Sequence, residues 1–447
     1  MTGDTIFAPS TGAGPAGVAV IRLSGPGAEA ALRRLNGTVA PPRRLARARI
    51  TDGATDDATG EVIDEGLAVW FPGPDSYTGE DTAEFHIHGG QATVAAVLDA
   101  LAACPGVRPA EPGEFTRRAF ENGKMDLTAA EGLADLVAAE TAAQRRQALR
   151  QLDGDLGRLY EKWRQQLLGT LAHQEATIDF SDEELPDEID TKVRLEVAAL
   201  DCRIADHLDD GRRGERLRAG VHVIIMGAPN VGKSSLLNLL AHRDAAIVSA
   251  TAGTTRDVIE VAMDLGGYPV IVADTAGLRD SDGEVEREGV RRARQRAGDA
   301  DLKLAVFDAP SWPDADGETA QVVDADTVVA INKADLATPN PPLEVGGRPA
   351  YPVSVLTGVG VDALVAVLER EVAERCSVSA SPLLTRVRHR QALEDCRAGL
   401  GRFLAADSPE LAAEDLRLAA RSLGRITGRV GVEDMLDIIF RDFCIGK

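Results

Sequence analysis

One short glycine-containing segment restricts the fold of this chain more than any other feature. Residues 227–234, which read GAPNVGKS, match the pattern GxxxxGK[ST]. An apolar run with β character precedes the motif at 221–226, and an amphipathic helical run follows it at 235–240. In that setting the N–H groups of a glycine-rich turn and of a helix N-terminus surround phosphate oxygens. We therefore predict that Lys233 contacts the β- and γ-phosphates and that the Ser234 hydroxyl binds Mg²⁺.

Two further motifs identify the nucleotide. Residues 274–277 read DTAG and residues 332–335 read NKAD, and each segment directly follows an apolar run. A carboxylate at the end of a strand can hold Mg²⁺ through water, and the N–H of Gly277 can donate to a γ-phosphate. The Asp335 carboxylate can accept from guanine N1–H and from the exocyclic amine, whereas adenine would leave it without donors. The three ordered motifs predict a guanine-nucleotide domain of the P-loop GTPase type.

The residues leave two questions about hydrolysis open. In Ras-like GTPases a Gln two positions after the DxxG glycine orients the attacking water, but here Arg279 stands two positions after Gly277. A downstream carboxylate can polarise the water instead. The candidates are Asp280, Asp282, Glu284, Glu286 and Glu288. The positive charge at the phosphates has two candidate sources: an arginine (Arg256 or Arg279), or a monovalent cation held by Asn230 and carbonyls of 249–257.

The amino-acid composition and the hydrophobic pattern change several times along the 447 residues, which indicates a multidomain protein. Residues 1–120 alternate short β-like runs with Pro- and Gly-rich turns, as a small α+β domain does. Residues 126–178 and 190–208 have the composition and spacing of long helices. Between 221 and about 375, continuous apolar runs separated by helical segments predict a buried, mostly parallel sheet. The C-terminal part is predicted to be helical at 383–403, 411–423 and 434–440. The simplest architecture is an α/β domain inserted into a discontinuous helical domain.

The apolar runs and the cysteine pattern of the sequence indicate the cellular location of the protein. No apolar run reaches roughly 18 residues, and the first thirty residues lack a basic start followed by an apolar block. We therefore expect neither a membrane helix nor a secretory signal. The five cysteines are scattered, odd in number and never in a CxxC pair. That pattern favours reduced thiols and a cytoplasmic location.

The net charge of the chain limits the kinds of molecule that the protein can bind. The 49 Lys and Arg residues against 71 Asp and Glu residues give a net charge of −22, which excludes a whole-surface nucleic-acid binder but not a local basic patch. Arg417, Arg421 and Arg425 recur at helical spacing, with Arg429 just beyond, and form one candidate RNA-binding stripe. A second basic cluster lies within 386–390, at Arg386, Arg388, His389 and Arg390.

These motifs resemble the signatures of the MnmE (TrmE) family of tRNA-modification GTPases. The resemblance spans nearly the whole chain, because signatures occur at both ends as well as in the nucleotide domain. They are GAPNVGKSSLLN at 227–238, AGTTRD at 252–257, DTAGLR at 274–279, FPGP at 71–74, YTGED at 77–81, HGG at 88–90 and FCIGK at 443–447. The terminal CxGK tail is the most specific of them.

The resemblance implies a domain order and a reaction. Residues 1–120 would bind tetrahydrofolate and dimerise, 121–217 and 377–447 would form a helical domain ending in the CxGK tail, and 218–376 would be the G domain. The protein would be a homodimeric, potassium-stimulated GTPase that forms a heterotetramer or larger complex with the FAD-dependent partner MnmG, away from any membrane. Together they would add a carboxymethylaminomethyl-type group at C5 of the wobble uridine of certain tRNAs. The one-carbon unit would come from 5-formyl- or methylene-tetrahydrofolate.

The resemblance also assigns ion and folate ligands. Mg²⁺ would be held by Ser234 and Thr255. K⁺ would be held by Asn230, the Ser249 and Thr251 carbonyls and Thr254. Folate would contact Arg22, Glu84, Lys124 and Lys447.

The remaining assignments concern catalysis and the nucleotide. Glu286 would orient the water, Lys233 would stabilise the phosphates, and Cys444 in the tail would be a candidate catalytic thiol. GTP itself would contact the phosphate loop, the segment after the first helix and the two later motifs. These residues are Asn230, Val231, Gly232, Lys233, Ser234, Ser235, Ser249, Ala250, Thr251, Ala252, Gly253, Thr254, Thr255, Asp274, Thr275, Ala276, Gly277, Asn332, Lys333, Asp335, Ser354 and Val355.

One departure and one competing function accompany this interpretation. The family's guanine-closing loop usually reads Ser-Ala-Lys or Ser-Ala-Arg, whereas residues 354–356 here read SVL. We therefore expect a changed side-chain cover over the base. The competing hypothesis is a regulatory or ribosome-assembly GTPase that acts only as a nucleotide switch. The N-terminal domain and the CxGK tail discriminate between the two, because a pure switch needs neither.

Overall fold

The computed structural model of the chain divides into two compact units. Unit 1 comprises residues 1–134, 152–161 and 423–447, and unit 2 comprises residues 135–151 and 162–422. The structure describes residues 3–53, 60–179, 188–243, 260–274, 300–313, 316–337, 343–377, 382–431, 433–441, 443 and 446. Within this part of the chain, no helix combines the length and the apolar character needed to cross a bilayer.

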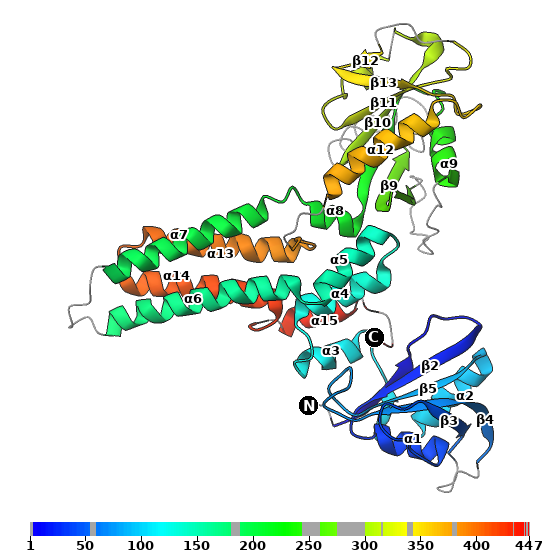
Figure 1. Cartoon of the computed structure of the whole chain (residues 1–447), viewed down its shortest axis with the longest axis vertical. Coiled ribbons are helices and arrows are strands. Elements are labelled where there is room, and N and C mark those ends of the chain that lie inside the picture. The colour runs from blue at the N-terminus through cyan, green and yellow to red at the C-terminus, as the bar shows by residue number, and fades with distance from the viewer. Residues whose placement is uncertain are drawn as a thin grey trace, which may run out of the picture. The chain divides into compact units, whose positions relative to one another are not determined.

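Unit 1 is built on a six-stranded sheet with helices against it (Figure 1). All neighbouring strands are antiparallel except β1 and β6, which are parallel. The spatial order is β3 (Ala46–Thr51), β4 (Val62–Phe71), β5 (Thr82–Gly89), β2 (Ala16–Ser24), β1 (Thr5–Pro9) and β6 (Val107–Pro109). The helices within this unit are α1 (Ala28–Asn36), α2 (Gln91–Ala102), α3 (Glu114–Glu121) and α15 (Glu433–Arg441). Leu32 of α1 and Leu101 of α2 are buried in one core with Ile21 and Phe85 of the sheet. The α+β character predicted for the N-terminal part is confirmed.

Unit 2 contains a seven-stranded, mostly parallel sheet, as predicted. Only the two edge strands, β8 and β12, are antiparallel to their neighbours. The spatial order is β12 (Glu344–Val345), β13 (Arg348–Pro352), β11 (Thr327–Asn332), β10 (Leu302–Asp308), β7 (Val221–Met226), β9 (Tyr268–Asp274) and β8 (Glu260–Leu265). The four strands predicted from apolar runs are β7, β9, β10 and β11, which lie at the centre of the sheet.

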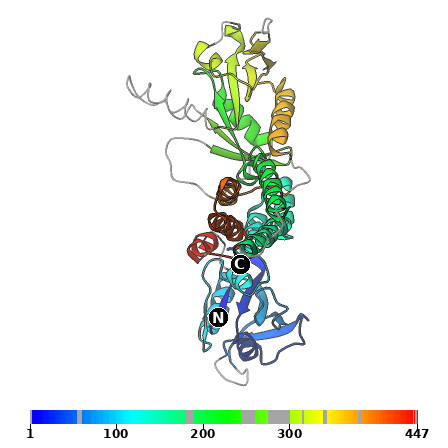
Figure 2. The ribbon, with the colours of Figure 1, turned by 90° about the vertical axis from the view of Figure 1, so that its left-hand side faces the viewer.

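Both faces of this sheet are buried, which explains the continuous apolar runs. Ile225 and Val306 belong to one core, and their chain neighbours Ile224 and Phe307 belong to a second core. Successive side chains of a strand point to opposite faces, so each face needs its own apolar set. Helix α12 (Val361–Cys376) contributes Leu364, Leu368 and Val372 to the first core, and Figure 2 shows it running along the sheet.

The long helices of the chain form the predicted helical part. In unit 2, α7 packs along α13, although well over a hundred residues separate them in the chain. Their bounds and those of the shorter helices are α7 (Glu188–Leu208), α8 (Arg213–Ala219), α9 (Lys233–Arg243), the 3-10 turn η2 (Ala309–Ser311), α11 (Gly317–Ala320) and α13 (Val387–Ala405). Four helices have residues in both units: α4 (Leu127–Ala138), α5 (Ala142–Leu152), α6 (Asp155–Asp179) and α14 (Pro409–Thr427). The insertion of the α/β part between α7 and α13 agrees with the predicted architecture.

Two details of the helical prediction are corrected. The helical region predicted at 126–178 is three helices, and the second break includes Gly154, which has φ +85°. The helix predicted to begin at 383 begins at Val387 instead. Residues before it are held extended by tertiary contacts: the Thr385 hydroxyl donates to Gln151 Oε1 at 2.9 Å, and a Cβ on Gly214 would lie 2.2 Å from the Leu384 carbonyl oxygen. These tertiary contacts therefore override the local helix propensity of the residues just before Val387.

Candidate functional site

The predicted phosphate loop connects the end of β7 to the start of α9, which is the strand–loop–helix setting that the motif requires. Three of its residues have positive φ: Gly227 (+152°), Asn230 (+62°) and Gly232 (+98°). A Cβ at Gly227 would lie 2.3 Å from the Val306 carbonyl oxygen, and one at Gly232 would lie 2.3 Å from Asn332 Nδ2. Both positions therefore accept only glycine, and the backbone of the loop lies directly against the neighbouring strands.

Three side chains expected at the phosphates converge at this loop. Lys233 is 7% exposed, and its Nζ donates to the carbonyl oxygens of Gly227 and Ala228 at 2.9 Å each. The Ser234 hydroxyl donates to Asp274 Oδ2 at 2.5 Å, although the two residues are 40 positions apart. They meet because β7 and β9 are parallel neighbours. A hydroxyl and a carboxylate oxygen together suit a hard cation such as Mg²⁺.

The base motif is connected to the phosphate loop through Asn332. Its Nδ2 donates to the Val231 carbonyl oxygen at 2.8 Å, and its Oδ1 accepts from the Val355 N–H at 3.2 Å. The buried Ser354 hydroxyl donates to Asp335 Oδ1 at 2.5 Å. The Asp335 residue itself is exposed. The carboxylate expected to bind guanine is therefore oriented by a neighbouring hydroxyl while it stays open to a ligand.

Three further described residues lie in or beside the phosphate loop and the base motif. Lys333 has φ +62°, and its Nζ forms an ion pair with Asp308 Oδ1 at 3.1 Å. Ser235 is exposed in the first turn of α9. Leu356, at the position where the resemblance leads one to expect Lys or Arg, is 85% exposed. It adds an apolar side chain and no charge beside the base motif.

Much of the predicted site lies outside the described residues, and these assignments stay predictions. They are the Glu286, Cys444 and Lys447 assignments and the positions Ser249, Ala250, Thr251, Ala252, Gly253, Thr254, Thr255, Thr275, Ala276 and Gly277.

In unit 1, two of the residues expected to contact folate lie side by side on β2 and β5. Arg22 and Glu84 are cross-strand partners, and Nε lies 2.8 Å from Oε1. The Arg22 guanidinium also lies 5.2 Å from the centre of the Tyr77 ring. Burial raises the pKa of the Tyr77 phenol, so this hydroxyl stays protonated at neutral pH. Lys124 has a separate partner, because its Nζ donates to the Pro74 carbonyl oxygen at 2.9 Å.

The C-terminal tail meets the end of β1 within unit 1. The Ser10 hydroxyl donates to the Gly446 carbonyl oxygen at 3.1 Å. Gly446 has φ +96°, and a Cβ there would lie 2.0 Å from the Pro9 carbonyl oxygen. Gly446 is therefore required for this contact. Sequence reasoning missed Ser10, and the tail motif itself was the only signal that pointed to this region.

Three arginines of the basic patches predicted from the sequence are neutralised by carboxylates. Arg417 is exposed but pairs with Glu175 at 2.8 Å and with Glu414. In the second cluster, Arg386 pairs with Asp135, and Arg390 pairs with two carboxylates. The side chains of Arg386 and Arg390 are only 19% and 14% exposed. The expectation of an open basic surface at 386–390 is therefore corrected: these arginines tie helices together.

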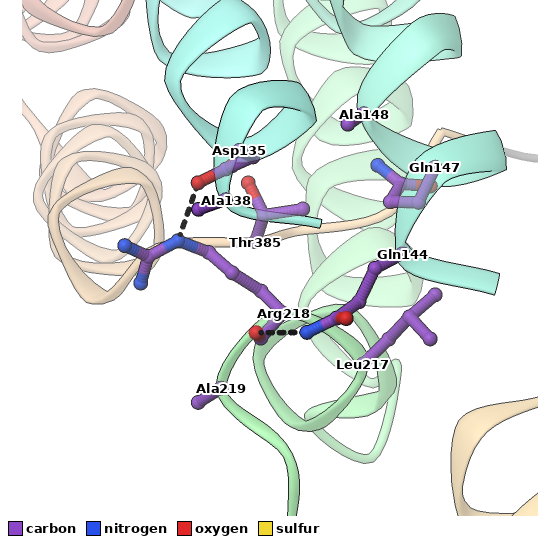
Figure 3. Close-up of a pocket in the computed structure, with 9 residues that line it drawn as sticks. All are labelled: Asp135, Ala138, Gln144, Gln147, Ala148, Leu217, Arg218, Ala219 and Thr385. Atoms are coloured by element: carbon purple, nitrogen blue, oxygen red, sulfur yellow. Dashed lines mark hydrogen bonds and ion pairs between the residues drawn. The ribbon is translucent and has the colours of Figure 1, made fainter. Parts of the chain in front are cut away.

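A cavity of about 150 Å³ lies where the sheet of unit 2 joins its helices (Figure 3). It is lined by Asp135, Ala138, Gln144, Gln147, Ala148, Leu217, Arg218, Ala219 and Thr385. Asp135 Oδ1 accepts from Arg218 Nε at 2.9 Å and from Arg386 Nη2 at 2.8 Å. The first arginine lies just before β7 and the second lies just before α13. One carboxylate thus holds both chain segments that connect the sheet to the helices.

Comparisons with known proteins agree with the motifs along the chain. A model of the N-terminus of the GTP-binding protein TrmE matches residues 5–124, and a model of the MnmE helical domain matches residues 127–444. The tRNA modification GTPase MnmE of Paramagnetospirillum magneticum is 59% identical, over 99% of this chain and 100% of that protein. The MnmE of Rhodospirillum rubrum is 57% identical, over 100% of both chains. A human mitochondrial subunit of 5-taurinomethyluridine-[tRNA] synthase is 50% identical, over 100% of this chain and 94% of that protein.

Proposed function

The chain belongs to the MnmE (TrmE) family of tRNA modification GTPases, and we propose that it acts, stimulated by potassium, on the wobble uridine of certain tRNAs. With an FAD-dependent partner of the MnmG type, it adds a carboxymethylaminomethyl-type group at C5 of that uridine. A tetrahydrofolate derivative, 5-formyl or methylene, supplies the one-carbon unit. The observation that supports the proposal is that two side chains from other strands meet one phosphate loop: Asp274 accepts from Ser234, and Asn332 donates to the Val231 carbonyl oxygen.

The described residues give the nucleotide a bound position. Lys233 exchanges its two carbonyl acceptors for the β- and γ-phosphates, and the N–H groups at the start of α9 donate to the same phosphates. Ser234 and Thr255 hold Mg²⁺, with Asp274 acting through water. Bound magnesium supplies positive charge beside the β- and γ-oxygens. Asp335 accepts from guanine while Ser354 keeps the carboxylate oriented.

The proposed potassium site and water-orienting group depend on residues outside the described part. K⁺ is held by Asn230, the carbonyls of Ser249 and Thr251, and Thr254. Asn230 supports this assignment because it lies in an exposed turn at the phosphate loop with φ +62°. Bound potassium supplies the positive charge that an arginine provides in other GTPases. Glu286 orients the attacking water.

The N-terminal domain is proposed to bind the folate. Arg22 and Lys124 attract its anionic tail, and Glu84 accepts from the pterin edge. The partly buried Arg22–Glu84 pair and the nearby Tyr77 ring support this assignment, since a flat ring needs both polar groups and an aromatic surface. Lys447 is proposed as a further folate contact, and the bond from the Ser10 hydroxyl to its neighbour Gly446 supports this assignment. Cys444 is proposed as a catalytic thiol.

The proposed assembly is a cytoplasmic homodimer that binds two partner molecules, giving a heterotetramer or a larger complex. The word "subunit" in the name of the human relative supports a partner protein. Exposed apolar side chains on the sheet of unit 1, Val18 (56%) and Leu67 (38%), support dimerisation through that domain.

Nucleoside analysis of tRNA from a strain that lacks this protein tests the proposal. We expect the C5-modified wobble uridine to disappear and to return when the wild-type protein is supplied. A Lys233→Ala variant should fail to restore it, because the phosphates lose their lysine. An unchanged set of wobble uridines in the deletion strain would refute the proposal and favour the nucleotide switch.

The potassium assignment has its own test. GTP turnover of the full-length protein is compared in KCl and NaCl at equal ionic strength, for the wild type and for Asn230→Lys. We expect faster turnover of the wild type in KCl and no difference between the salts for the variant. Equal rates of the wild type in both salts would eliminate the potassium site and leave the tRNA proposal intact.

A further inference from the structure

The solvent-exposed face of α5 carries three arginines. Arg145, Arg146, Leu149 and Arg150 are exposed, and they recur at the i, i+4 spacing of one helical face. The opposite face of the helix is buried or half-buried and includes Ala143, Gln144, Gln147, Ala148 and Gln151. Figure 3 shows three of these inward residues, Gln144, Gln147 and Ala148, at the cavity. The "α5 face" denotes Arg145, Arg146, Leu149 and Arg150 below.

The arginines of the α5 face differ from Arg386, Arg390 and Arg417, whose charges are balanced by neighbouring carboxylates. Helix α5 itself contains no Asp or Glu. Within the described part of the chain, Arg145, Arg146 and Arg150 form no ion pair, whereas Arg417 and Arg390 are both paired. The chain as a whole has a net charge of −22, so these three positive charges form a local region of opposite sign. Such a group attracts a polyanion more strongly than the neutralised clusters do.

Hydrogen bonds to neighbouring segments hold helix α5, and with it the α5 face, in place. The Ala143 N–H donates to the Gly267 carbonyl oxygen at 3.1 Å, which ties the helix start to the turn between β8 and β9. Gln144 Nε2 donates to the Arg218 carbonyl oxygen at 3.0 Å, and Gln151 accepts from Thr385 at 2.9 Å. These bonds fix both ends of the helix within unit 2. The arginines are therefore presented in a preformed row beside the nucleotide-binding sheet.

We propose that the α5 face binds the sugar–phosphate backbone of tRNA, an inference that rests on the proposed function. The rise from Arg145 to Arg150 is about 7.5 Å, so the three guanidinium groups can reach neighbouring phosphates of one strand. Guanidinium presents a planar fork of donors that matches phosphate oxygens. Leu149 is the one apolar side chain of the face, 42% exposed, which is too little for the apolar centre of a protein–protein interface. Nucleic acid is therefore the favoured occupant.

The test compares two triple variants of the full-length protein that remove the same charge. One replaces Arg145, Arg146 and Arg150 by Ala, and the other replaces the ion-paired Arg397, Arg402 and Arg417 by Ala. Binding of a tRNA is measured by fluorescence anisotropy over a range of KCl concentrations. For the α5 variant we expect at least about tenfold weaker binding at moderate salt and a salt slope reduced by about two units, because three phosphate contacts are lost. The second variant should bind as the wild type does.

The outcomes separate the inference from the proposed function. If the wild type binds no tRNA, the proposed function fails. If the wild type binds and the α5 variant has the same affinity and slope, the inference alone is overturned. If that variant binds tRNA normally but loses wobble-uridine modification with the partner protein, the face binds the partner and the inference is also overturned.

Two controls exclude trivial explanations. The GTPase rate of the α5 variant without tRNA should equal that of the wild type, because none of the three arginines belongs to the nucleotide site. A triple Arg→Lys variant should keep most of the salt slope, since charge rather than helix packing is tested. A Lys variant as weak as the Ala variant, with a flat slope, would count against phosphate contacts.

Discussion

Gly446→Ala tests whether the C-terminal tail depends on its contact with β1. The new Cβ would lie 2.0 Å from the Pro9 carbonyl oxygen, whereas real Cβ contacts stay beyond 3.0 Å, so the tail must move. Positive φ costs alanine about 1–2 kcal/mol. Movement also breaks the bond from the Ser10 hydroxyl to the Gly446 carbonyl oxygen, worth about 1 kcal/mol. The sum of about 2–3 kcal/mol lowers the ratio of docked to undocked tail by roughly 30- to 150-fold.

Hydrogen–deuterium exchange of the C-terminal peptide, read by mass spectrometry, measures this change. We expect faster exchange in Gly446→Ala and a loss of tRNA modification, with an unchanged rate of GTP hydrolysis. Gly431→Ala is the matched control, because Gly431 also has positive φ (+61°) but nothing within 4 Å of its Cβ position. Equal exchange in Gly446→Ala and in the wild type would refute the docking argument.

Three further predictions concern unit 2. Ser354→Ala removes a hydrogen bond to Asp335, the carboxylate proposed to bind guanine, and should weaken GTP binding by about 10- to 100-fold in a nucleotide titration, whereas Thr357→Ala, an exposed neighbour, should not. Burial lowers the pKa of His207 from 6.5 to about 4, so the unfolded chain binds a proton that the folded chain does not. The contribution of neutral His207 to stability is therefore fully present above pH 6.5, and about 3 kcal/mol of it should be lost as the pH falls from 6.5 to 4. Thermal melting across this range should show a smaller fall for His207→Gln but not for the exposed control His242→Gln; identical pH profiles would contradict the assignment. Asp135→Asn weakens two ion pairs at once and should lower the free energy of unfolding by about 1–2 kcal/mol in a urea titration. An unchanged midpoint would show that these ion pairs do not stabilise the fold.

The sequence predicted the parts of the site that depend on local pattern. The phosphate loop and the apolar runs before Asp274 and Asn332 are short segments with strict backbone demands, so residue identity alone identifies them. Glycine at 227 and 232 is an example, because a side chain at either position would meet a neighbouring strand or side chain. The buried parallel sheet was equally predictable, since both of its faces need apolar residues.

The rest depends on contacts between segments far apart in the chain. The start of α13 at Val387 was missed because Thr385 is held extended by Gln151, more than two hundred residues earlier. The basic cluster at 386–390 was misread because the carboxylates that neutralise Arg386 and Arg390 come from distant segments of the chain. Charge partners of this kind have no signature in a linear pattern.

The central claim is that hydrolysis of GTP at this phosphate loop serves tRNA modification. The direct measurement is a reaction of the purified protein with the proposed FAD-dependent partner, a tetrahydrofolate derivative, tRNA, Mg²⁺ and KCl, with the C5-modified uridine quantified by mass spectrometry. We expect product with GTP, and none with a non-hydrolysable GTP analogue or with the Lys233→Ala variant. Equal product yields with GTP and with the analogue would contradict the account.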